Sequence, residues 1–394
     1  MITVIADDFT GAAEIGGIGL RRGLEVIIDT KVQDNYDADL LIIATDTRSF
    51  SKEKASDEIR KLTKQIIELA PEYSFKKIDS VLRGNVIDEL IAQMEASEKK
   101  KAIVIAGNPH FNRIIKNGTY YVNEVPLAKT FFAQDPQYPI QSSNIVDILA
   151  NGHDPSQIIS VGVDQELPGE GMIFGDVVDE ADMMKWAERL DGDTVIAGGA
   201  GFFDSLLKKS FPLMDSKTEY TYKLGDKTLF VFGSTYPKSD KLINQIRQLG
   251  MCIVNMPEEV YLNPAYDEKL IDEWANNISD YLKTNKKVVV TIDHNGSTDK
   301  DISIRVREII GLLIRKVVDK VELDDLLIEG GDTSSVILNH LEVSTLFPFQ
   351  ELGHGVIQMK AENYPNMCIT TKPGSYKWPD NIWISDTTQP KVLG

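Results

Sequence analysis

The sequence predicts an α/β protein of two domains, each a mostly parallel sheet flanked by helices, with an active site in the cleft between them. Short β-branched runs alternate with amphipathic segments along most of the 394 residues, which is typical of parallel sheets covered on both faces. Eleven such runs are too many for one comfortable sheet, and the alternation lapses in the polar stretch 215–227. We therefore predict one domain at residues 1–224 and a second at 225–394.

Each predicted strand is a short apolar run that ends in polar or turn-forming residues. The first domain is expected to hold strands at 2–6, 40–45, 76–79, 102–106, 158–162 and 194–199. The second is expected to hold strands at 229–233, 252–255, 287–292, 326–331 and 367–372. The spacing of apolar side chains predicts helices at 51–70, 84–97, 180–190, 238–249, 266–284, 301–319 and 333–341. A glycine-rich helix is expected to begin near Gly11 and to pack closely against the sheet.

One insertion interrupts this alternation. Residues 108–140 contain four prolines and six aromatic residues, with a turn signal at Asn117-Gly118. This composition favours a hairpin or a long ordered loop over a helix. Such a segment can be a lid, a homodimer contact or surface decoration, and the sequence leaves these alternatives open.

Composition excludes several partners. The formal charge of −18 argues against non-specific binding to nucleic acid or to an anionic membrane. No apolar run approaches the ~20 residues that cross a bilayer, and the start MITVIADDFTG does not resemble a signal peptide. Cys252 and Cys368 lie in apolar runs and are interpreted as buried thiols. We therefore expect a cytoplasmic protein that uses neither nucleic acid nor a membrane.

Charged and hydroxyl side chains lie at the ends of three strands of the first predicted domain. These are Asp7 and Asp8, then Arg48, then Lys76, Lys77, Asp79, Ser80 and Arg83. In parallel sheets ligands bind at the carboxyl ends of the strands. The arginines and lysines would form a basic cluster for a carboxylate, while Asp8 and Asp79 could bind hydroxyls and accept a proton. The pattern suits a small polyhydroxy acid, with helix capping and surface ion pairs as the simpler alternative for each residue alone.

Glycine and hydroxyl residues follow the strands of the second predicted domain. They are Ser234, the run Gly330-Gly331-Asp332-Thr333-Ser334-Ser335, and Gly374-Ser375. At strand-to-helix turns such residues leave backbone N–H groups and a positive helix end for phosphate oxygens. We expect Thr333 and the serines to add hydroxyl contacts at the helix start. Plain turn and N-cap chemistry is the alternative. No GxxxxGK[ST] loop, HExxH spacing or GxSxG elbow occurs.

Together these motifs resemble the four-carbon acid sugar kinase family. The similarity lies in IADDFTGA at 5–12, DTRS at 46–49, KKIDSVLRGN at 76–85, FGSTYP at 232–237 and EGGDTSSVIL at 329–338. The stretch from Gly118 to Ile140 is also similar. The resemblance implies transfer of the γ-phosphate of ATP, with Mg²⁺ bound to the nucleotide, to a hydroxyl of threonate, erythronate or 3-oxo-tetronate. It implies a role in carbohydrate-acid catabolism.

Roles carried over by motif divide between the two domains. The resemblance implies that Asp8, Arg48, Lys77, Asp79 and Ser80 contact the substrate, with Arg83 as an addition. We expect Asp7 to bind the substrate too, and Asp8 or Asp79 to be the catalytic residue that orients the attacking hydroxyl. The resemblance also implies that Ser234, Gly330, Gly331, Asp332, Thr333, Gly374 and Ser375 contact ATP, and it assigns no metal ligand. The sequence TKPGSY at 371–376 departs from the Gly-Asn-Phe-Gly-like turn that the family usually has there.

Two other functions fit the same sequence. One is a regulatory protein that holds a sugar acid and a nucleotide without turnover. The other is an NAD-dependent sugar-acid dehydrogenase, although Asp7-Asp8 occupies the turn where a dinucleotide pyrophosphate would sit and no GxGxxG lies there. Within the kinase hypothesis, we expect Arg48 and Lys77 to fix the substrate carboxylate.

Overall fold

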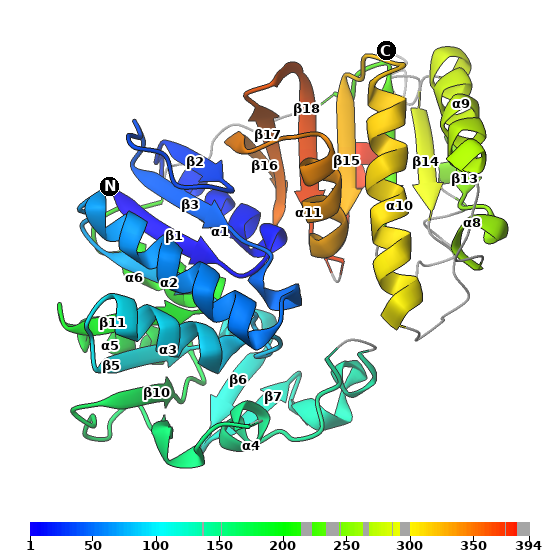
Figure 1. Ribbon diagram of the computed structural model, residues 1–394. Coiled ribbons are helices and arrows are strands. Elements are labelled where there is room, and N and C mark those ends of the chain that lie inside the picture. Colours follow the sequence, from blue (N-terminus) through cyan, green and yellow to red (C-terminus); the bar gives the residue numbers. More distant parts are fainter. Residues whose placement is uncertain are drawn as a thin grey trace, which may run out of the picture. The chain divides into compact units, whose positions relative to one another are not determined.

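The computed structural model describes residues 1–135, 138–150, 152–213, 223–233, 244, 246–262, 268–285, 287–291, 300–374 and 376–383. The chain separates into two compact units, Met1–Asp215 (unit 1) and Ser216–Gly394 (unit 2), each built on a sheet flanked by helices (Figure 1). The predicted α/β fold class is confirmed. Most of the polar stretch at 215–227 lies outside the described residues, so the predicted boundary at 224 stays a prediction.

Unit 1 contains a sheet whose described strands all pair in parallel. They run in the order β2 (Val26–Asp29), β3 (Leu40–Ala44), β1 (Ile2–Ala6), β4 (Ser74–Lys77), β11 (Thr194–Gly198), β5 (Lys101–Ile105), β10 (Gly171–Gly175) and β9 (Ile158–Val161). In the register, Ala6 lies beside both Ala44 and Lys77. Strands β1, β3 and β4 therefore end level with one another, and the residues that follow them meet at one sheet edge.

Helices cover both faces of this sheet (Figure 1). α2 (Lys52–Glu68) packs against α3 (Val86–Ala96), while α6 (Ala200–Leu207) packs against α1 (Phe9–Arg21) and α5 (Glu180–Glu188). A Cβ atom on Gly19 of α1 would lie 2.8 Å from side-chain atoms of both Leu40 and Val26. Close helix-to-sheet packing therefore requires glycine there, as the sequence predicted.

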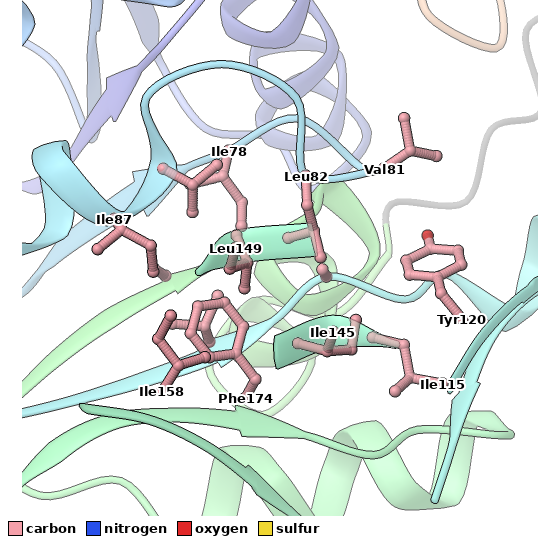
Figure 2. Packing of buried hydrophobic residues seen from close by; sticks show 14 of the residues in the cluster. Ile78, Val81, Leu82, Ile87, Ile115, Tyr120, Ile145, Leu149, Ile158 and Phe174 are labelled. Carbon is pink, nitrogen blue, oxygen red and sulfur yellow. The ribbon is translucent and has the colours of Figure 1, made fainter. Parts of the chain in front are cut away.

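The insertion forms a small antiparallel sheet, so the hairpin is observed of the two predicted forms, a hairpin or a long ordered loop. Its strands are β6 (Arg113–Lys116), β7 (Thr119–Val122) and β8 (Val125–Pro126). Asn117 and Gly118 both have positive φ, 50° and 66°, as a tight two-residue hairpin turn requires. Figure 2 shows Ile115, Tyr120 and the short helix α4 (Ile145–Leu149) packed in one buried cluster with Ile78 and Leu82. This cluster fixes the insertion against the loop that follows β4.

Unit 2 contains a mixed sheet. Its strands run in the order β13 (Cys252–Asn255), β14 (Lys287–Thr291), β12 (Thr228–Phe232), β15 (Asp325–Glu329), β18 (Tyr364–Lys372), β17 (Val356–Ala361) and β16 (Thr345–Gly353). The pairs from β13 to β18 are parallel, and β17 pairs antiparallel with both neighbours. Phe232, Glu329 and Lys372 lie side by side in the register, so β12, β15 and β18 also end level.

The described helices of unit 2 are α8 (Glu258–Leu262), α9 (Glu268–Asn285), α10 (Lys300–Val318) and α11 (Gly331–His340). α10 packs between α9 and α11. Most of the helix predicted at 238–249 lies outside the described residues. All eleven predicted strands are present, whereas β2, β10, β16 and β17 were not predicted. Among the helices that the structure describes, none combines the length and apolarity needed to span a bilayer.

Candidate active site

The level ends of β1, β3 and β4 bring the predicted charged residues of unit 1 together. Asp7 and Asp8 follow β1, Arg48 lies in the 3₁₀ turn Thr47–Ser49 after β3, and Asp79 follows β4. The guanidinium of Arg48 donates from Nε to Asp7 Oδ2 (2.9 Å) and from Nη1 to Asp8 Oδ2 (2.7 Å). Its Nη1 also lies 3.6 Å from Asp79 Oδ1. One arginine, whose side chain is only 13% exposed, therefore holds three carboxylates at the sheet edge.

Asp8 has a second role as the N-cap of α1. Its Oδ1 accepts from the backbone N–H of Gly11 at 2.7 Å, and the Thr10 hydroxyl donates to its Oδ2 at 3.1 Å. A Cβ on Gly11 would lie 2.6 Å from Asp8 Oδ1 and 3.1 Å from Lys77 Nζ. Glycine is therefore needed for the Asp8 carboxylate and the Lys77 ammonium to lie this close to the helix start.

Asp79 is held by the turn that follows it. Its Oδ2 accepts from the backbone N–H groups of Val81 and Arg83 at 3.1 Å, and the Arg83 side chain donates to both oxygens at 2.8–2.9 Å. Burial alone would raise the pKa of Asp79, but Arg83 and then Arg48 outweigh it and hold that pKa far below its usual range. Arg83 also donates to Asp135 at 2.8 Å. Asp79 is therefore ionised at any physiological pH.

The two adjacent lysines of β4 point to opposite faces, because successive side chains of a strand alternate. Lys77 is buried, donates to the Ile78 carbonyl at 3.1 Å and has Glu14 of α1 at 3.9 Å. Lys76 is fully buried on the other face and pairs with Glu89 of α3 at 2.6 Å. Burial raises the pKa of Glu89, and Lys76 opposes the shift. Placing Lys76 in the substrate-binding basic cluster was therefore wrong.

We call Asp7, Asp8, Arg48, Lys77, Asp79 and Arg83 the strand-end cluster. The insertion contributes three side chains beside it, which the sequence analysis missed. Arg113 donates to the Ser80 hydroxyl, Tyr120 to the Ser80 carbonyl and Tyr138 to the Arg48 carbonyl. In Figure 2 the phenol oxygen of Tyr120 points toward the segment that carries Val81. The insertion is therefore part of this site, 30 or more residues along the chain from the strands that define it.

In unit 2, the turn between β15 and α11 has the predicted character. Gly330 precedes the helix at φ 105°, and no side chain caps the first turn. The first N–H groups of a helix have no acceptor within the helix, so Gly331, Asp332 and Thr333 offer donors to a ligand. Ser334 uses its hydroxyl differently from our expectation, because it donates to the Gly330 carbonyl at 2.8 Å. We call residues 330–333 the amide turn.

The neighbouring strand ends support this turn. A Cβ on Gly233, after β12, would lie 1.9 Å from Thr333 Oγ1, so glycine is required for the two segments to meet. Lys372, at the end of β18, is buried, lies 3.0 Å from Glu329 Oε2 and donates to the carbonyls of Pro373 and Tyr376 at 2.9 and 2.8 Å. These contacts fix the turn that contains Gly374. Ser234 and Ser375 lie outside the described residues.

Two further features bear on phosphate and metal chemistry in unit 2. Arg307 of α10 donates to Asp332 at 3.0 Å, which brings a cation to the amide turn; the sequence analysis did not identify it. Among the residues that the structure describes, no group of three His, Cys, Asp or Glu side chains could hold a metal ion.

Comparison with known proteins identifies the two units. Residues 2–206 match the model of a sugar-binding N-terminal domain, and residues 229–376 match that of a nucleotide-binding C-terminal domain. The chain thus combines a domain of a sugar-binding family with a domain of a nucleotide-binding family. The chain belongs to the four-carbon acid sugar kinase family.

Several named relatives and solved structures are similar over most of the chain. D-threonate kinase from Salmonella typhimurium is 25% identical (86% of each chain), and D-erythronate kinase from Heliobacterium modesticaldum is 23% identical (87% of this chain, 86% of the relative). A 3-oxo-tetronate kinase from Brucella melitensis is 22% identical (95% and 92%). The fold is shared with a Salmonella typhimurium protein provisionally described as a tRNA synthase (TM-score 0.76, 17% identity, 97% of each chain) and with a Haemophilus influenzae protein (TM-score 0.69, 18% identity, 96% and 98%).

Proposed function

We propose that this protein is an ATP-dependent kinase that phosphorylates a hydroxyl of a four-carbon sugar acid. The observation that carries the proposal is the strand-end cluster, in which three carboxylates and three cations converge in the unit that matches a sugar-binding domain. The names of the relatives, kinases for threonate, erythronate and 3-oxo-tetronate, support this substrate class.

In this proposal unit 1 binds the acceptor. The residues that contact it are Asp7, Asp8, Arg48, Lys77, Asp79, Ser80 and Arg83. Asp8 and Asp79 are the catalytic residues that orient the attacking hydroxyl by accepting its hydrogen bond. The depressed pKa of Asp79 makes it a weak base, which suits orientation better than early proton removal. Phosphoryl transfer through a loose transition state depends mainly on positioning and charge neutralisation.

Unit 2 binds the nucleotide in the same proposal. The amide turn, residues Gly330, Gly331, Asp332 and Thr333, donates backbone N–H groups to phosphate oxygens, with Gly374, Ser234 and Ser375 completing the site. The uncapped start of α11 fits such an anion, because unsatisfied N–H groups and the helix dipole both favour negative charge. When bound with ATP, Mg²⁺ neutralises charge on the phosphate oxygens.

The experiment is ADP release with a panel of four-carbon acids, followed by kcat for Asp8→Asn and Asp79→Asn. We expect turnover with at least one acid and a fall in kcat of about 10²- to 10⁴-fold in each variant, the usual range for a positioned acid–base group. Asp57→Asn is the control, since Asp57 is an exposed residue of α2 that pairs with Arg60. Near wild-type turnover in both site variants would exclude the assignment, and binding without ADP release would favour a non-catalytic regulator.

A further inference from the structure

The two arginines of the strand-end cluster are already engaged by carboxylates, and its Lys77 donates to the Ile78 carbonyl and has Glu14 at 3.9 Å. Arg48 binds Asp7 and Asp8 at 2.7–2.9 Å and has Asp79 at 3.6 Å. Arg83 binds Asp79 and Asp135 at 2.8 Å. A sugar acid would have to compete with these carboxylates for the same guanidinium groups. An anionic ligand therefore needs a further cation at this site.

Arg113, at the start of β6, is such a cation. Its Nη1 donates to the neutral Ser80 hydroxyl, and its guanidinium lies 5.8 Å from the centre of the Phe132 ring. Within the part of the chain that the structure describes, no Asp or Glu oxygen lies within 4 Å of it. A guanidinium has five N–H donors, and one bond to a hydroxyl leaves most of them available.

The same contacts place Arg113 at the cluster. The guanidinium of Arg83 also lies over the Phe132 ring, 5.6 Å from its centre. One aromatic ring therefore orients both arginines. Ser80, which Arg113 contacts, is the residue directly after Asp79. Arg83 in turn donates to Asp79 at 2.8 Å. A small ligand with a hydroxyl at Asp79 and a carboxylate at Arg113 would therefore lie among residues that already contact one another.

We propose that Arg113, with the Ser80 hydroxyl beside it, binds the carboxylate of the sugar acid and determines the preference for acids over neutral polyols. The proposal rests on the proposed function for its substrate class. It replaces our expectation that Arg48 and Lys77 fix this group. In this arrangement Arg48 holds the aspartates in place, and the aspartates bind the hydroxyls.

The first test measures binding of threonate and erythronate by calorimetry without nucleotide. The Arg113→Met variant should bind these acids about 10- to 150-fold more weakly than wild type, because it loses charge-assisted hydrogen bonds to the carboxylate. Arg113→Lys, which keeps the charge but loses the planar fork, should fall between wild type and Arg113→Met. Lys116→Met is the matched control, because it removes the same charge from an exposed position of β6 and should bind like wild type.

The second test separates a direct contact from a structural role. With ATP present, kcat/KM is compared for the acid and for the tetritol that carries CH₂OH in place of the carboxylate. Arg113→Met should lower the acid value about 10- to 150-fold, leave the tetritol value nearly unchanged and leave the KM for ATP unchanged. Equal losses for acid and tetritol would show that Arg113 only supports the fold, and would overturn the proposal.

The outcomes also distinguish this inference from the kinase proposal. Suppose that the wild-type protein binds the acid, that Arg113→Met weakens this binding, and that no ADP is released. The kinase function is then wrong, while the role of Arg113 stands. If ADP is released but Arg113→Met binds the acid like wild type, the role of Arg113 is wrong and the kinase function stands. If the wild-type protein binds no four-carbon acid, the inference is wrong.

Discussion

The two units form their candidate sites at the same place in the sheet but from different chemical groups. In unit 1 the ends of β1, β3 and β4 present charged side chains that contact one another at 2.7–3.6 Å. In unit 2 the ends of β12, β15 and β18 present glycines and the start of a helix that no side chain caps. A polyhydroxy acid needs directional partners of both signs, whereas phosphate oxygens are satisfied by backbone N–H groups.

This difference predicts how each site fails. In unit 1 the buried charges balance one another, so removing one leaves buried groups of the opposite charge less well compensated. In unit 2 the ligand-binding groups belong to the backbone, so the sensitive positions are those where a side chain would change the path of the chain or block approach. Charge changes should thus disrupt unit 1, and added Cβ atoms should disrupt unit 2.

The largest effect is expected for Arg48→Met. Arg48 is the partner of Asp7 and Asp8 and lies near Asp79, and these carboxylates are buried. Breaking a buried ion pair from one side costs about 3–5 kcal/mol. We expect the unfolding free energy of unit 1 to fall by about that much, measured by native-state hydrogen exchange of β1 and β4 in urea. We also expect turnover to be lost.

Arg60→Met is the comparison for this variant. Arg60 also contacts two carboxylates, Asp57 and Glu95, but on the exposed surface of α2. Water replaces an exposed ion pair at little cost, so stability and turnover should stay near wild type. Similar losses in both variants would mean that the burial of Arg48 does not matter.

A smaller effect is expected from acid. The folded pKa of Asp79 lies below its ordinary range, so its ionised form stabilises unit 1 above the unfolded pKa of about 4, and that stabilisation is lost as the pH falls further. We expect the stability of unit 1 to fall between pH 5 and pH 2. In the Asp79→Asn variant, the loss of unfolding free energy with falling pH should be shallower in the same exchange experiment. An unchanged dependence on pH would contradict the ionised state of Asp79.

The fold and much of the site could be predicted because both follow from local patterns. Buried strands are continuous β-branched runs, and the residues after parallel strands meet at one edge, which placed Asp7, Asp8, Arg48 and Asp79 together without knowledge of strand order. The same alternation rule could have excluded one of the two adjacent lysines of β4, since Lys76 and Lys77 must face opposite sides.

The remaining features depend on contacts that no local pattern encodes. Arg113 reaches Ser80 only because the insertion folds back over the loop after β4 through a buried apolar cluster. The antiparallel strands β16 and β17 were not predicted, because Pro348 interrupts the strand pattern and the other strands were expected to be parallel. The structure accommodates Pro348 through a register shift beside it. Irregular strand pairing of this kind tolerates proline.

In unit 2 the corresponding test is Gly330→Ala. Gly330 has φ 105° and ψ 138°, a conformation that costs an L-residue about 1–3 kcal/mol. We expect loss of stability in that range and a higher KM for ATP, with the KM for the sugar acid unchanged. Gly250→Ala is the control, because Gly250 also has positive φ (70°) but has nothing within 4 Å of a Cβ; it should leave the KM for ATP unchanged.

The smallest effect is expected for Ser334→Ala, which asks whether hydroxyl groups or only amides of this turn bind phosphate. The Ser334 side chain is fully buried and donates to the Gly330 carbonyl, a bond worth about 0.5–1.5 kcal/mol. The better helix propensity of alanine offsets part of that loss, so stability should fall by less than about 1 kcal/mol and the KM for ATP should not change. A tenfold rise in that KM would mean that the hydroxyl leaves Gly330 for the nucleotide. The turn would then bind phosphate with a side chain after all, as the sequence alone predicted, and the contrast between the units would be weaker.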